Sequence, residues 1–262
     1  MSVSLRTIKA FVIDMDGVLY RGQARLPGAR AFLLALQRED VPYVLLTNNS
    51  TLTVAQYVEK LRRMDIEVAP ERILTSAVAT ALYLAGRAEP GTPMYMIGMD
   101  GLEEALREQG FVLTDGNPEY VVVGLDTDAT YQALSTATLA IRDGAAFIGT
   151  NPDPTLPTER GLEPGAGAIL AAIEAATGVQ PQIIGKPQPG AFEVALRRLN
   201  TRPGETAMLG DRMETDVVGG ARAGLRTILV LTGATSRDDL ANAEVEPDWV
   251  FDRLEQVLAA RR

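Results

Sequence analysis

Short apolar runs alternate with longer segments of helical periodicity along almost the whole chain of 262 residues. In the first and last parts, the strand-like runs are residues 8–14, 43–46, 73–75, 183–185, 207–210, 227–231 and 249–251. The helical segments among them are residues 28–38, 53–63, 76–86, 191–199, 217–223 and 254–261, with Ser76 as a predicted N-cap. This alternation predicts an α/β fold in which mainly parallel strands are covered by helices.

The composition excludes several classes of catalytic site. The chain has no cysteine and no histidine, which rules out disulfides, thiolate or imidazole zinc sites, a cysteine nucleophile and Ser-His-Asp catalysis. An enzyme of this composition is expected to use a carboxylate for acid/base chemistry, with Lys or Tyr as further candidates. Its oxygen ligands suit Mg²⁺ rather than Zn²⁺ or Cu²⁺.

The net charge of −9 does not favour binding to nucleic acid or to an anionic membrane. A phosphorylated substrate would therefore have to be held by local donors and a metal. No apolar run approaches the roughly 18 residues of a membrane span, and residues 1–9 lack the pattern of a signal peptide. We expect a cytoplasmic protein.

Asp14 and Asp16 follow the apolar run 10–13 directly and precede Gly17. In an open α/β sheet, ligands bind at the carboxyl ends of the strands. Two carboxylates placed there are costly to desolvate unless a cation neutralises them. The segment therefore indicates a metal-assisted site in which one carboxylate can act as a nucleophile. An ordinary Asp-Gly turn after a strand is the alternative.

Two further predicted strands end in polar residues. Thr47 and Asn48 offer a hydroxyl and an amide after the second strand, although a helix-capping loop before Thr53 would use the same residue types. Lys186 lies between a glycine and a proline after another strand, and a solvated surface lysine is the alternative.

A fourth strand end contributes Gly210 followed by Asp211 and, five residues later, Asp216. N-capping of the next helix by Thr215 or Asp216 is the alternative, and it is compatible with a catalytic role. The four strand ends together supply what phosphoryl transfer needs. A carboxylate attacks, Mg²⁺ offsets the repulsion between anions, a hydroxyl, an amide and a lysine hold the oxygens, and a second acid moves the proton.

In the same order along the chain, these segments resemble the motifs of the haloacid dehalogenase (HAD) superfamily, in its NagD-like or p-nitrophenyl-phosphatase branch. The matching segments are residues 14–20, 46–50, 150–153, 164–168, 185–187 and 210–216. The resemblance implies a Rossmann-like three-layer core with a parallel sheet and an inserted α/β cap domain. It also implies a Mg²⁺-dependent phosphatase that hydrolyses small phosphomonoesters through an aspartyl-phosphate intermediate.

The resemblance also implies roles for the acidic residues. Asp14 is the nucleophile and a Mg²⁺ ligand. Asp16 is the acid/base, and its main-chain carbonyl is a second ligand. Asp211 is the third protein ligand, and Asp216 orients metal-bound water or the lysine.

For the phosphoryl group, the resemblance implies binding by Thr47 and Asn48, with Lys186 neutralising the phosphate and the nucleophile. Two other functions stay open on the sequence. A phosphotransferase would share the aspartyl-phosphate, and a non-catalytic module would bind a phosphometabolite without turnover. The substrate is expected to be a nucleotide, sugar or related metabolite phosphate, and a homodimer through the cap is a further expectation.

Spacing locates the predicted cap. Thr47 follows Asp14 by 33 positions, which a turn and a helix fill, whereas Lys186 follows Thr47 by 139. A βα crossover needs far fewer residues. The surplus, residues 81–182, is predicted to be an inserted cap, and residues 1–80 and 183–262 are predicted to form a discontinuous catalytic core.

The predicted cap has its own strands at residues 94–97, 111–113, 120–125 and 147–150, and helices at residues 102–109, 131–142 and 167–176. Among its polar residues, Asp126, Asn151 and Asp153 are candidates for contacts with the leaving group. The alternative is turn chemistry, since Asp and Asn form turns on any scaffold.

Overall fold

The computed structural model describes residues 4–158 and 160–261. Its contacts divide the chain into two compact units, which are described separately below. Unit 1 comprises residues 1–47, 55–74 and 187–262, and unit 2 comprises residues 48–54 and 75–186. The predicted insertion, residues 81–182, falls inside the longer segment of unit 2.

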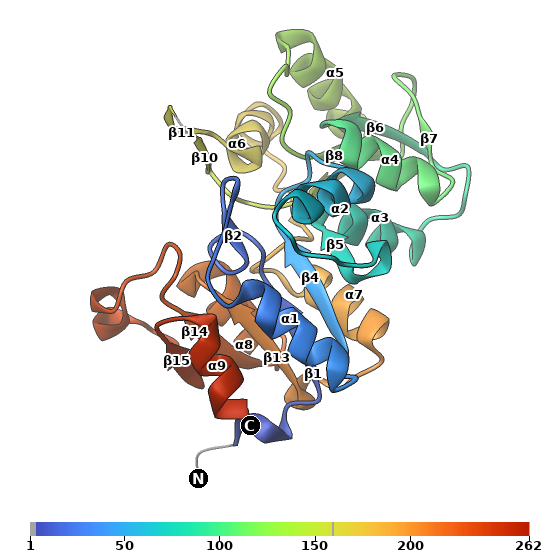
Figure 1. Cartoon of the computed structure of the whole chain (residues 1–262). Helices are drawn as coiled ribbons and strands as arrows, with labels where there is room; N and C mark the ends of the chain where they lie inside the picture. The colour runs from blue at the N-terminus through green and yellow to red at the C-terminus, as the bar shows by residue number, and fades with distance from the viewer. Residues whose placement is uncertain (1–3, 159, 262) are drawn as a thin grey trace. The chain divides into compact units, whose positions relative to one another are not determined.

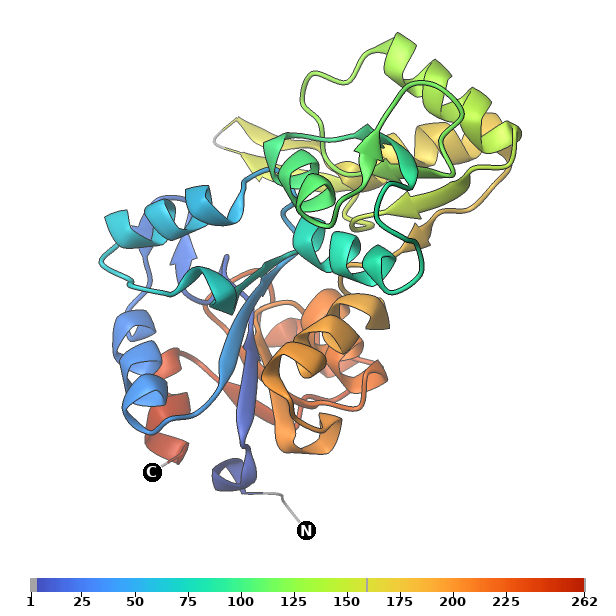
Figure 2. The ribbon, with the colours of Figure 1, turned by 90° about the vertical axis from the view of Figure 1, so that its right-hand side faces the viewer.

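Unit 1 is built on a six-stranded sheet. Its order is β15 (Trp249–Phe251), β14 (Arg226–Val230), β13 (Thr206–Gly210), β1 (Ala10–Ile13), β4 (Tyr43–Thr47) and β5 (Ile73–Thr75). Every pairing from β15 to β4 is parallel. Figure 2 shows the covering helices: α1 (Ala29–Arg38) and α9 (Leu254–Arg261) on one face, α7 (Pro189–Leu199) and α8 (Val218–Arg222) on the other. The predicted three-layer α/β core is confirmed.

The register of the sheet brings the functional strand ends to one edge. Ile13, the last residue of β1, is paired with Leu209 of β13 and Leu45 of β4. The N–H of Asp14 continues the ladder by donating to the carbonyl of Leu209 at 2.8 Å. Parallel strands end on the same side of a sheet, so residues 14, 47 and 211 all follow or close neighbouring strands at this edge.

A hairpin occupies the stretch between β1 and α1 where the sequence indicated only a turn. Its strands are β2 (Tyr20–Arg21) and β3 (Ala24–Arg25), joined through Gly22 at φ +56°. The Gly17 N–H donates to the carbonyl of Tyr20 at 2.8 Å, and the side chain of Tyr20 is buried. The hairpin therefore folds back against the residues that follow β1. Helix α2 (Val54–Arg63) comes after β4.

Unit 2 has its own parallel sheet, in the order β12 (Gln182–Ile183), β9 (Ala146–Gly149), β8 (Tyr120–Val123), β6 (Pro93–Ile97) and β7 (Val112–Leu113). Side chains alternate along its strands, so the two faces carry separate apolar clusters. One cluster includes α3 (Ser76–Ala85) and α4 (Asp100–Glu108), and the other includes α5 (Tyr131–Arg142) and α6 (Ala166–Thr177).

The second sheet explains two differences from the sequence prediction. Strand β12 pairs with β9, so the segment beginning at Ile183 belongs to unit 2, although the pattern grouped it with the core strands. A hairpin of β10 (Thr155–Thr158) and β11 (Gly161–Pro164) was not predicted (Figure 1). None of the helices in the described part of the chain is both long and apolar enough to cross a bilayer.

The packing of α1 on the sheet gives a prediction of stability. Phe32 of α1 is fully buried, and its ring meets that of Phe11 edge-on, with centroids 5.8 Å apart. We expect Phe32→Ala to lower the free energy of unfolding by about 3–5 kcal/mol, because a large cavity replaces the ring. The single tryptophan, Trp249 in β15, reports unfolding of unit 1 by fluorescence in urea. Arg38→Ala on the exposed side of the same helix is the control, with an expected change within about 0.5 kcal/mol. Equal effects of the two substitutions would contradict this account.

Candidate active site

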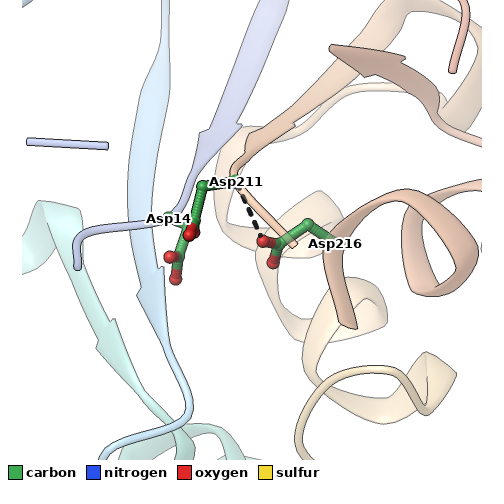
Figure 3. Close-up of side chains that lie close together, drawn as sticks. All are labelled: Asp14, Asp211 and Asp216. Carbon is green, nitrogen blue, oxygen red and sulfur yellow. Dashed lines mark hydrogen bonds between the residues drawn. The ribbon is translucent and has the colours of Figure 1, made fainter. Parts of the chain in front are cut away.

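Three buried carboxylates meet at the edge of the sheet of unit 1. One oxygen from each of Asp14, Asp211 and Asp216 lies within 4.8 Å of the other two (Figure 3). Asp14 follows β1 and Asp211 follows β13, whereas Asp216 lies on a π-helical turn, Met213–Val217, that leads into α8. Single-turn π-helices of this kind are frequent at functional sites.

Asp216 also organises the main chain around it. Its Oδ2 accepts hydrogen bonds from the N–H groups of Asp211 at 3.2 Å and Arg212 at 3.1 Å; Figure 3 shows the first. A Cβ on Gly210 would lie only 2.3 Å from the side chain of Asp216, so glycine is needed for this approach. The Asp216 carboxylate therefore fixes the main chain that carries Asp211 and is at the same time a member of the cluster.

Asp211 lies in a cradle of main-chain atoms. Its Oδ2 accepts from the N–H of Ala234 at 2.6 Å. A Cβ on Gly17 would lie 2.5 Å from this oxygen, and one on Gly233 would lie 1.8 Å from it. Gly17 also has φ +79°, a left-handed conformation that side chains disfavour. The two glycines therefore make the space in which the Asp211 carboxylate is held.

The cluster fits a divalent cation. Three carboxylates so close together repel one another, and burial strengthens the repulsion unless a cation offsets it. All three potential ligand atoms are carboxylate oxygens, which favours a hard cation over zinc or copper. Of the predicted ligands, Asp14 and Asp211 are in the cluster, and Asp216 joins them. The predicted ligation by the carbonyl of Asp16 stays a prediction.

Asp16 differs from these carboxylates because part of it remains exposed. Burial of the rest of the group raises its pKa, and the positive charges of Lys60, Arg212 and Arg21 partly oppose the shift. A raised pKa favours the protonated form of the carboxyl. An acid catalyst needs that proton.

Sequence reasoning missed the residues that surround Asp16 and Thr47 in unit 1. Lys60 on α2 lies over the ring of Tyr20, with Nζ 4.2 Å from the centroid, and 5.9 Å from the centroid of Tyr57. The hydroxyl groups of Tyr57 and Thr47 are hydrogen-bonded to each other. Tyr57 and Lys60 are three residues apart on a helix that begins soon after Thr47, and this spacing on one face could have indicated them.

The predicted phosphoryl-binding residues are divided between the two units. Thr47 is buried at the end of β4 in unit 1, whereas Asn48 and the buried Lys186 belong to unit 2. The amide of Asn48 donates to the carbonyl of Lys186 at 2.9 Å and to both carboxylate oxygens of Asp153 at 3.2 Å. Its side-chain donors are thus used within unit 2. The phosphoryl contacts of Thr47, Asn48 and Lys186 stay predictions.

The polar residues predicted to contact the leaving group lie in two different settings. The Oδ1 of Asp126 accepts from the N–H of Asp128 at 2.9 Å, which is a local turn. Asn151 donates to the carbonyl of Asn48 at 2.8 Å, and Asp153 contacts the amide of the same residue. Turn chemistry therefore accounts for Asp126. Asn151 and Asp153 also form a local turn, in which the Oδ1 of Asn151 accepts from the N–H of Asp153 at 3.1 Å, and in addition they contact the distant Asn48.

Comparisons with known proteins show which family the chain resembles. Residues 11–112 match the family model of haloacid dehalogenase-like hydrolases, and residues 183–257 match the HAD-hydrolase-like model. An acid sugar phosphatase of Staphylococcus aureus is 44% identical over 256 residues, which cover 97% of this chain and 98% of the relative.

Solved structures extend the likeness to the whole fold. A 4-nitrophenylphosphatase from Thermotoga maritima superposes with a TM-score of 0.94 at 39% identity, covering 98% of this chain and 99% of that one. A glycerol phosphate phosphatase from Mycobacterium tuberculosis, in complex with magnesium, superposes with a TM-score of 0.90 at 32% identity. That comparison covers 98% of this chain and 78% of the other.

Neutralising one carboxylate of the cluster should weaken cation binding without lowering the stability of the cation-free protein. We expect Mg²⁺ at about 100 times its Kd to stabilise the unsubstituted protein by about 2.7 kcal/mol. Asp211→Asn should lose most of this gain because one charged ligand is missing, and in EDTA it should unfold no earlier than the parent because repulsion is relieved. Thermal unfolding with and without Mg²⁺ measures both effects.

Glu214→Gln, which neutralises an exposed acid on the same turn, is the matched control and should keep the full Mg²⁺ effect. An equal Mg²⁺ effect in Asp211→Asn and in the parent would show that the cluster is not the cation site.

Proposed function

The chain belongs to the haloacid dehalogenase-like hydrolase family and is a phosphoric monoester hydrolase of that family, and we propose that it is Mg²⁺-dependent and acts through an aspartyl-phosphate on Asp14. The observation that carries the proposal is the buried cluster of Asp14, Asp211 and Asp216, with Asp16 two residues after the nucleophile. This arrangement would supply a nucleophile, a cation site and an acid/base at the carboxyl ends of β1 and β13.

In the first proposed step, a carboxylate oxygen of Asp14 attacks the phosphorus of the substrate. The bond between phosphorus and the alcohol oxygen breaks, and Asp16 gives its proton to that oxygen as the alcohol leaves. The raised pKa of Asp16 supports this role, since the group has to be protonated at the start. Asp14 is then phosphorylated and Asp16 is ionised.

In the second proposed step, Asp16 takes a proton from a water molecule, and the water oxygen attacks the phosphorus of the aspartyl-phosphate. The bond from Asp14 to phosphorus breaks, which releases inorganic phosphate and restores the carboxylate. The proton on Asp16 is the one needed for the next turnover. One carboxyl can therefore serve both steps in alternate protonation states.

The remaining site residues would bind the cation and the phosphoryl group. Asp14, Asp211 and the carbonyl of Asp16 would hold Mg²⁺, with Asp216 orienting the surrounding groups, and the cation would offset repulsion between Asp14 and the phosphoryl oxygens. The hydroxyl of Thr47, the main-chain N–H of Asn48 and the ammonium of Lys186 would bind the phosphoryl group itself.

We also propose the class of substrate and the setting. The names of the relatives favour a small sugar or glycerol phosphate, with p-nitrophenyl phosphate as an artificial substrate. The net charge of −9 argues against nucleic acid or an anionic membrane as partner. A cytoplasmic location and a homodimer through the predicted cap complete the proposal.

Asp14→Asn tests the nucleophile. The amide keeps the shape of the side chain but cannot attack phosphorus, so we expect kcat with p-nitrophenyl phosphate to fall by at least about 10³-fold. In EDTA, thermal unfolding should occur no earlier than that of the parent, which separates lost chemistry from lost folding. Turnover near the parent rate, with deamidation excluded by mass spectrometry, would refute an attack by Asp14.

Asp16→Asn tests the acid/base. With glycerol 3-phosphate, whose alkoxide leaves poorly, we expect a fall of about 10²- to 10⁴-fold. With p-nitrophenyl phosphate the leaving group needs little protonation, so the first step should stay fast. Nitrophenol should therefore appear as a burst close to the enzyme concentration. Slow turnover should follow, because aspartyl-phosphate accumulates without the base. Rapid-mixing absorbance and intact-protein mass spectrometry measure the burst and the phosphoenzyme. Absence of both, with equal losses on the two substrates, would contradict the role.

A further inference from the structure

Asn48 is the centre of a hydrogen-bonded junction inside unit 2. Its amide donates to Asp153 and to the carbonyl of Lys186, and its own carbonyl accepts from Asn151 at 2.8 Å and from the hydroxyl of Ser76 at 2.5 Å. These five residues are called the Asn48 junction below. Ser76 was predicted to cap α3, but Thr75 caps it by accepting from the N–H of Val78 at 3.1 Å. Ser76 is thereby available to the junction.

The junction joins segments that are far apart in the sequence. Asn48 directly follows β4, Asn151 and Asp153 lie in the loop after β9, and Lys186 follows β12. The hydrogen bonds of the Asn48 amide span 105 positions to Asp153 and 138 positions to Lys186. The junction therefore ties the main chain of Lys186 to Asn48, which directly follows Thr47 in the sequence.

Chemistry fixes the orientation of the Asn48 amide. The Asp153 carboxylate and the Lys186 carbonyl are both acceptors, so the nitrogen has to face them. The amide oxygen is left buried without a hydrogen-bond partner in the described part of the chain, and a Cβ on Gly185 would come within 2.9 Å of it. An unsatisfied buried acceptor is destabilising. The charge-assisted bonds to Asp153 are the compensating interaction.

We propose that Asp153 and Asn151 are positioning residues, which hold Asn48 and Lys186 in the arrangement that binds the phosphoryl group. The inference rests on the proposed phosphatase function. It departs from the sequence prediction that these two residues contact the leaving group. Both carboxylate oxygens of Asp153 accept from the amide of Asn48, so this group is already engaged within unit 2.

The first experiment compares Asp153→Ala with the parent on p-nitrophenyl phosphate, glycerol 3-phosphate and glucose 6-phosphate. A positioning residue acts on the phosphoryl group that all three share, so kcat/KM should fall by one common factor of about 10- to 100-fold. Factors that differ by tenfold or more among the esters would assign Asp153 to the leaving group and overturn the proposal. So would an unchanged kcat/KM per folded molecule, which would mean a role in folding alone.

Two variants accompany this comparison. Asp143→Ala removes an exposed carboxylate at the end of α5 in the same unit and should leave all three values of kcat/KM unchanged. Asp153→Asn keeps the shape and one acceptor oxygen, so its common factor should be smaller than that of Asp153→Ala. If Asp153→Ala fails to fold, Asp153→Asn is judged by the same criterion of a common factor across the esters.

A double-mutant cycle tests whether Asp153 acts through Asn48. In an Asn48→Ala background, Asp153→Ala should lower kcat/KM by less than about twofold further, because the partner amide is already absent. Fully multiplicative losses would show that Asp153 acts elsewhere and would overturn the proposal. Failure of the parent to release phosphate from any of the esters would instead refute the proposed function, so the two failures are distinguishable.

Discussion

Repulsion among the carboxylates of Asp14, Asp211 and Asp216 is the constraint on which the rest of the site depends. Three buried like charges within 4.8 Å are unfavourable unless donors and a cation offset them. The chain supplies part of the compensation through main-chain N–H groups: that of Ala234 to Asp211, and those of residues 211 and 212 to Asp216. Gly17 and Gly233 keep the space around Asp211 open. The remaining deficit of positive charge is what suits the cluster to bind a cation.

The parallel sheet is what allows this concentration of charge. Neighbouring strands lie about 4.8 Å apart, so residues that follow β1 and β13 at the same register are within reach of a single ion. Parallel connections return the chain to the same end of the sheet each time, and the carboxyl ends therefore collect polar residues from distant parts of the sequence. The third carboxylate, that of Asp216, does not directly follow a strand. The π-helical turn Met213–Val217 instead directs Asp216 back towards Asp211.

The sequence could predict the parts of the site that depend on strand ends. Asp14 and Asp211 follow apolar runs, and a residue directly after a buried parallel strand has little freedom in where it goes. The direction of the Asn48 amide could not be predicted, because it depends on Asp153, whose loop reaches it only in the folded unit. Lys60 was missed for a related reason. Its place over Tyr20 depends on a hairpin that the apolar pattern did not indicate.

A chain without histidine or cysteine has to obtain most of its acid/base and metal-binding chemistry from carboxylates in different environments. The structure does so by giving each carboxylate a different neighbour. Asp216 accepts hydrogen bonds from main-chain N–H groups, and Asp153 accepts them from the amide of Asn48. For Asp16, burial raises the pKa of the carboxyl, and nearby positive charges partly oppose the shift. Main-chain and amide donors hold a carboxylate in one place, whereas the partial burial of Asp16 raises its pKa and so favours its protonated form. Environment, rather than residue type, therefore separates the structural carboxylates from the one suited to move a proton.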